Sequence, residues 1–89
     1  MIDVTAVHMS AGGSRHEHID SLRWRNPESG EAGQSTRAQM VTWIDEGGKA
    51  YVVVGNLRVE VRVVKAHPPY VQTYADGVWK DNLLALPRF

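Results

Sequence analysis

The sequence predicts an α+β fold in which about five mostly antiparallel strands carry one amphipathic helix on one face. Several segments alternate apolar and polar residues with the period of a strand, whereas residues 36–46 repeat with the period of a helix. The clearest signal is a pair of strand-like runs, Ala50–Val54 and Leu57–Val64, separated by Gly55-Asn56. Such a dipeptide is typical of a two-residue hairpin turn.

Residues 2–10 and 18–25 are predicted to form the first two strands, paired antiparallel. The loop between them, residues 11–14, contains two adjacent glycines, which disfavour regular structure. The alternation predicts that one face of the first strand carries Ile2, Val4, Ala6 and His8, and that Leu22 and Trp24 of the second strand oppose Arg23 and Arg25.

The helix is predicted to follow a polar connection, residues 26–33, which contains one proline and two glycines and is expected to be mobile. Thr36 and Gln39 have the spacing of a capping box, so the helix should begin there. Its apolar stripe consists of Met40, Val41 and Ile44, with Trp43 beside it, and Gly47-Gly48 should end it.

In the predicted hairpin, the pleat of a strand sends Val59, Val61 and Val63 to the core and Arg58, Glu60 and Arg62 to solvent. A further strand is expected over residues 70–74, after His67-Pro68-Pro69, followed by a turn at Asp76-Gly77.

The C-terminal tail is too apolar to be left in water, and we expect it to dock on one end of the sheet. Asp81 or Asn82 should cap a single helical turn. Trp79 should be mostly buried, as should at least two of the three tryptophans, because so small a core needs its bulkiest residues. The tail residues expected to dock are Leu83, Leu84, Leu86 and Phe89.

Length and composition indicate one folded globular domain, residues 1–89, without a membrane-spanning segment or a secretory signal. Ten basic and ten acidic residues give a formal net charge of zero, so any binding of nucleic acid must depend on a local patch. The chain has no cysteine, which excludes a disulfide framework, a thiol nucleophile and cysteine-ligated zinc. A cytoplasmic location is expected.

Three motifs resemble a family of small bacterial proteins known only as a domain of unknown function. They are H-E-H-I at residues 16–19, Y-V-V-V-G at residues 51–55 and Y-A-D-G-x-W-x-D-N-L-L-x-L-P at residues 74–87. The resemblance covers nearly the whole chain and implies a stand-alone domain of bacterial type. It brings no activity, cofactor or partner with it.

Three histidines suggest one candidate site. His16 and His18 are two residues apart and would share a face if the strand began early, and His8 of the paired strand could add a third metal ligand. The alternative is that one histidine is fixed by Glu17 or a backbone carbonyl and the others are exposed loop residues.

A second candidate site combines arginines with tyrosines. Arg23, Arg25, Arg58 and Arg62 would give a sheet surface a basic stripe between tyrosine rings, as single-stranded nucleic acid requires. Pairing of these arginines with glutamate across strands is the alternative. Tyr74 and Asp76, near the C-terminal motif, are further candidates for ligand binding, although Asp76 equally suits a structural turn.

We therefore expect a non-enzymatic module that binds a protein partner, with no cofactor and no membrane. Binding of single-stranded nucleic acid and metal binding by the histidines are the alternatives, and a homodimer through an exposed strand edge is a further one. Any pocket is expected where the C-terminal tail meets the polar stretch 26–33 or the His16 loop.

Overall fold

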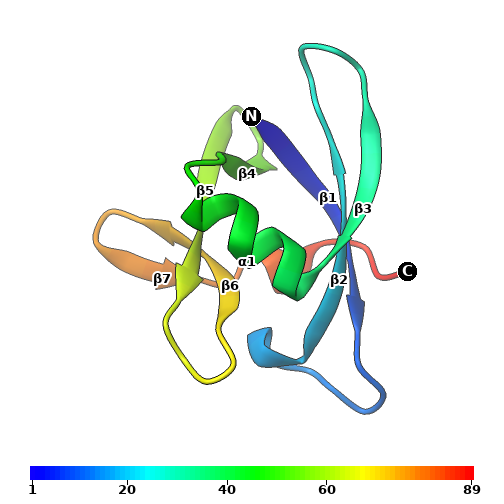
Figure 1. The fold of residues 1–89 in the computed structure, drawn as a ribbon. Helices are drawn as coiled ribbons and strands as arrows, with labels where there is room; N and C mark the ends of the chain where they lie inside the picture. Colours follow the sequence, from blue (N-terminus) through cyan, green and yellow to red (C-terminus); the bar gives the residue numbers. More distant parts are fainter.

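A computed structural model describes all 89 residues and confirms the α+β prediction. Its single sheet has seven strands in the order β3-β2-β1-β4-β5-β6-β7. The only helix longer than one turn, α1 (Arg37–Asp45), lies between the β1–β3 part of the sheet and the β5–β7 part (Figure 1). The strands are β1 (Ile2–Met9), β2 (Ile19–Arg25), β3 (Ala32–Thr36), β4 (Ala50–Val54), β5 (Leu57–Val64), β6 (Tyr70–Ala75) and β7 (Val78–Lys80).

The sheet has two more strands than expected, and β1 pairs with β4 in parallel. β3 was missed because Ala32–Thr36 has no large apolar residue with which to mark a strand. β7 was missed because it is only three residues long. The turn that leads into it is as predicted, with Asp76 at φ 55° and Gly77 at φ 77°.

The capping box at the start of α1 is also as predicted. The hydroxyl of Thr36 accepts a hydrogen bond from the Gln39 backbone amide at 3.1 Å, and the Gln39 side chain accepts one from the Thr36 amide at 2.8 Å. These bonds satisfy two amides that would otherwise lack partners.

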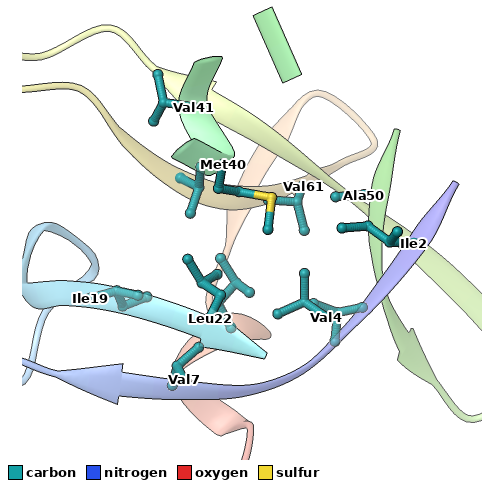
Figure 2. Packing of buried hydrophobic residues seen from close by; sticks show 12 residues of the cluster. Ile2, Val4, Val7, Ile19, Leu22, Met40, Val41, Ala50 and Val61 are labelled. Atoms are coloured by element: carbon teal, nitrogen blue, oxygen red, sulfur yellow. The ribbon is translucent and has the colours of Figure 1, made fainter. Parts of the chain in front are cut away.

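The core lies between α1 and the sheet. Met40 points from α1 toward Leu22 of β2 and Val61 of β5 (Figure 2). Val59 and Val63 share the face of Val61 but are only half-buried, and Arg58 and Arg62 are exposed as expected. The twelve residues of the core cluster are Ile2, Val4, Val7, Ile19, Leu22, Met40, Val41, Ala50, Val52, Val61, Val71 and Leu83.

The predicted faces of β1 are wrong beyond Val4. Register shifts interrupt its pairing with β2 between Val4 and Ala6 and again between His8 and Met9. A shift of one residue reverses which side chains face the core. Val7 is therefore fully buried and His8 is exposed, the reverse of the simple alternation.

The C-terminal tail docks along β1, whose edge β4 leaves open after Asp3. The Val7 amide donates to the Pro87 carbonyl at 3.0 Å, and the Phe89 amide donates to the Val7 carbonyl at 3.1 Å. Leu83, in the 3₁₀ turn Leu83–Ala85, is fully buried in the core. The tail is thus an integral part of the fold.

Two details of the tail differ from expectation. Neither Asp81 nor Asn82 caps the 3₁₀ turn by its side chain; Asn82 Oδ1 instead lies 3.1 Å from the hydroxyl of buried Thr73. Trp79 is 43% exposed and Trp43 36% exposed, while Trp24 is half-buried. The buried cluster under α1 consists of Met40 and aliphatic side chains, and of the three indoles only that of Trp24 packs against it.

Replacement of Leu83 by alanine tests the docking of the tail. Because Leu83 is fully buried, Leu83→Ala should lower the free energy of unfolding by about 2 to 5 kcal/mol. Leu57, which is 69% exposed, supplies the matched control, and Leu57→Ala should change stability by less than about 0.5 kcal/mol. Urea denaturation measures both, and equal effects would contradict a docked tail.

Candidate functional site

One concavity of the protein is a cleft of about 480 Å³ between α1, the β2–β3 hairpin and the start of β1. The polar stretch 26–33 contributes to it as predicted, through Asn26 and Glu31. The C-terminal tail and the His16 loop do not line it, so that part of the prediction was wrong. The lining residues are Met1, Ile2, Trp24, Asn26, Glu31, Gln34, Ser35, Gln39, Met40 and Trp43.

Trp24 forms one wall of the cleft and is fixed by β3. It pairs directly with Gly33, where a Cβ atom would lie 2.5 Å from Cζ2 of the indole, so any larger residue would displace the ring. The indole Nε1–H donates a hydrogen bond to the hydroxyl of Ser35 at 3.0 Å. The strand therefore holds the ring both by contact and by a hydrogen bond.

Trp43 lies on the opposite side, near the end of α1. A Cβ atom on Gly48 would overlap Cδ2 of its indole, so the ring packs directly on the backbone that follows the helix. The Gly48 amide donates to the Trp43 carbonyl at 2.9 Å, which holds this backbone in place. Both tryptophans of the cleft thus rest on a glycine.

The polar groups around the indoles differ in how far the protein itself uses them. Gln39 caps α1, and the side-chain oxygen of Asn26 accepts hydrogen bonds from the Glu28 and Ser29 amides at 2.9 and 3.2 Å. The side chains of Glu31 and Gln34 make no hydrogen bond within the protein, and Glu31 makes no ion pair. The cleft therefore offers a ligand one carboxylate and two indoles, since Gln34 pairs with Arg23 and its side chain projects to the other face.

The predicted arginines lie on the other face of the sheet, away from α1. Residues paired directly across strands project from the same face. One such row crosses six strands, from β2 to β7: Arg25, Asp3, Tyr51, Glu60, Tyr74 and Trp79. The other three arginines occupy the same face, because side chains two residues apart on a strand project to the same side. Arg23 is two residues from Arg25, and Arg58 and Arg62 are each two residues from Glu60.

Most of these arginines bind groups within the protein, although neither ion pair joins an arginine to a glutamate across strands. Arg58 donates two hydrogen bonds to the Asp3 carboxylate, at 3.0 and 3.1 Å, and this bonding raises the pKa of Arg58. Arg62 donates to Glu60 at 2.7 Å and lies 4.4 Å from the centre of the Tyr74 ring. The tyrosine face is thereby already covered by a cation.

Arg23 and Asp76 complete the predicted ligand-binding residues. Arg23 lies 4.1 Å from the centre of the Phe89 ring, on the docked tail. Asp76 is exposed in the β6–β7 turn and makes no ion pair. Of the predicted set, the structure thus brings Arg58, Arg62 and Tyr74 together on one face, and it leaves Asp76 at its margin.

The histidines do not converge. His8 contacts the Phe89 carbonyl through Nδ1, and His18 Nδ1 accepts hydrogen bonds from the Ser14 and Arg15 amides, both at 3.1 Å. His16 is buried in the 3₁₀ turn His16–His18. No group of three histidine, cysteine, aspartate or glutamate side chains is placed to hold a metal ion.

His16 is nevertheless unusual, because its buried Nε2 atom has no hydrogen-bond partner. The nearest carboxylate is that of Asp81, whose Oδ1 lies 3.9 Å away. His67 lies elsewhere, in a separate hollow of about 400 Å³ with Glu17 and Arg37.

The sequence interpretation missed the cleft because it assigned the tryptophans to the core. A signal was available: Trp43 lies beside the stripe of Met40, Val41 and Ile44 and is not part of it. A large aromatic residue at the margin of an apolar stripe need not be covered by the sheet.

The chain belongs to the family described as "Protein of unknown function (DUF3892)", whose model matches residues 3–87. No curated protein and no solved structure shows significant similarity to it. None of the helices has the length and apolar character needed to traverse a bilayer.

The pH dependence of stability tests the burial of His16. Burial lowers the pKa of His16 from its ordinary 6.5, against the opposing charges of Asp81 and Glu17. The unfolded chain therefore takes up this proton at a higher pH than the folded protein does. The contribution of His16 to the free energy of unfolding is constant above pH 6.5. It decreases, so that the folded protein becomes less stable, as the pH falls from 6.5 toward the folded-state pKa of His16.

Urea denaturation between about pH 8 and pH 5.5 should show this loss in the natural protein and a shallower one in His16→Gln. His67→Gln, which replaces an exposed histidine, is measured alongside it as the control. An identical pH dependence in the natural protein and His16→Gln would contradict the assignment.

Proposed function

We propose that this protein is a non-enzymatic binding module that holds a segment of a protein partner in the cleft between α1 and the β2–β3 hairpin. The observation that carries the proposal is the pair of indoles, Trp24 and Trp43, each seated on a glycine at the wall of the same cleft. Tryptophan is enriched among the residues that dominate protein interfaces.

The fixed position of the rings favours binding. A side chain that is already held in place loses little conformational entropy when a partner covers it. Trp24 is held by Gly33 and Ser35, and Trp43 by Gly48, before any partner arrives. The cleft is also of a size that suits one or two side chains of a peptide.

Nucleic acid is the less favoured ligand. Stacking of bases requires open aromatic faces next to free cations. On the arginine-bearing face, Arg62 covers Tyr74 and Arg23 covers Phe89, while Asp3 and Glu60 neutralise Arg58 and Arg62. Arg23 and Arg25 carry no ion pair, but Arg23 already lies over the Phe89 ring, so Arg25 is the only one of the four predicted arginines with neither a carboxylate nor a ring beside it.

Selection of binding peptides from a random phage-displayed library tests the proposal. Peptides selected on the natural protein should lose about tenfold or more in affinity for Trp43→Ala, because that variant lacks one wall of the cleft. Trp79 supplies the matched control: it is comparably exposed but belongs to the other face, so Trp79→Ala should bind the peptides normally.

Circular dichroism and thermal melting establish that both variants are folded. Selected peptides that bind Trp43→Ala as well as they bind the natural protein would overturn the proposal. Nucleic acid would be favoured instead if no peptide were selected and if the natural protein, but not Arg25→Ala, bound a single-stranded oligonucleotide.

A further inference from the structure

We infer that the partner segment is an extended basic peptide that pairs with the free edge of β3 and places a lysine or arginine side chain in the tryptophan cleft. This inference rests on the proposed function and specifies the chemistry of the ligand. Three features carry it: the edge of β3, the place of β3 in the cleft, and the charge of Glu31.

β3 is one of the two terminal strands of the sheet and pairs only with β2. Its outer backbone amides and carbonyls have no partner strand. Proteins usually protect such an edge with a charged residue, a proline, a bulge or a very short strand. The five residues Ala32–Thr36 are all small or neutral and include none of the charged or proline residues that serve this purpose.

The opposite edge shows the contrast. β7 is three residues long and ends in Lys80, so it is protected both by its length and by a charge. Since the same sheet protects one edge and leaves the other bare, the β3 edge is suited to receive another strand.

The edge and the cleft are continuous. Gln34 and Ser35 belong to β3 and line the cleft beside Trp24. A strand added to β3 would lie about 4.8 Å beyond it, and alternate side chains would project toward the helix side of the sheet. One of those side chains would therefore reach the cleft.

The charge of the cleft indicates which type of side chain the added strand would place there. Glu31 is the only charged side chain that lines the cleft, and it forms no ion pair within the protein, either with a basic side chain or with the amino group of Met1, a residue that also lines the cleft. On the sheet, by contrast, Asp3 pairs with Arg58, and Glu60 pairs with Arg62 and Lys49. A cation in the cleft would pair with Glu31 and contact the indole faces, both of which attract positive charge.

A second copy of the chain fits the site less well than a basic peptide. Pairing of two β3 strands would bring together two neutral segments, and neither would supply a cation for Glu31. We therefore assign the site to a different chain whose extended segment carries a basic residue.

The experiment compares peptide selections from the random phage-displayed library on the natural protein, Glu31→Gln and Glu28→Gln. Glu28 is an exposed carboxylate in the same loop and does not line the cleft, so Glu28→Gln is the matched control. Peptides that depend on Trp43 should be enriched in lysine or arginine at one position when selected on the natural protein and on Glu28→Gln. Selection on Glu31→Gln should lose that enrichment.

Synthetic copies of the selected peptides give the affinities. Changing the enriched basic residue to norleucine should weaken binding to the natural protein about tenfold and weaken binding to Glu31→Gln much less, since only the contact with the indoles is then lost. Binding should also protect backbone amides of Ala32–Thr36 from hydrogen exchange, since the edge gains a partner.

The outcomes separate this inference from the proposed function. Trp43-dependent peptides without a basic residue, a preference that survives Glu31→Gln, or absence of protection in β3 would overturn the inference and leave the cleft as a binding site. Peptides independent of Trp43 would overturn both. A dimer in sedimentation equilibrium that protects the same β3 amides would assign the edge to a second copy.

Discussion

The whole fold depends on the edge of β1 that faces away from β2, because two different segments pair with it. β4 pairs with β1 only at Ile2 and Asp3, and the C-terminal segment occupies the edge at Val7. After Asp3 the two halves of the sheet can therefore diverge, which lets them lie on either side of α1 (Figure 1). Without the tail, the backbone groups of Val7 would lose their partners, and the core would lose the side chain of Leu83 and be open to water.

The same arrangement explains why the tryptophans are available for binding. The space under α1 is filled by Met40 and by aliphatic residues of the strands, and Trp24 packs against this cluster without being fully buried. Glycines at positions 33 and 48 then provide flat backbone on which Trp24 and Trp43 rest at the margin. Each ring is fixed, yet part of its apolar surface remains uncovered. A partner that covers that surface would remove it from water, which is favourable by about 25 cal/mol per Å² of apolar surface buried.

The sequence predicted those elements in which local and tertiary signals agree. The α1 capping box, the Gly55-Asn56 hairpin and the Asp76-Gly77 turn depend on neighbouring residues, and the structure contains all three. The faces of β1 could not be predicted, because its register shifts arise from pairing with β2 and leave no mark on β1 itself. β3 is a strand because β2 offers it an edge, since its own residues have little strand propensity.

The candidate site was less predictable than the fold for a related reason. Arg58 and Arg62 were recognised from their alternation, and Glu60 lies beside Arg62 on the same strand, but only the arrangement of the strands shows that Asp3 of β1 neutralises Arg58. Glu31, in a polar stretch between two strands, had no feature that distinguished it from Glu28. What distinguishes Glu31 is its position in three dimensions, since it lines a cleft that contains two indoles and no cationic side chain. The partly buried carboxylates of Asp3 and Glu60, on the sheet, have basic partners instead. A carboxylate left unpaired in such a place costs the folded protein little while water reaches it, and it becomes a strong contact only when a ligand excludes that water.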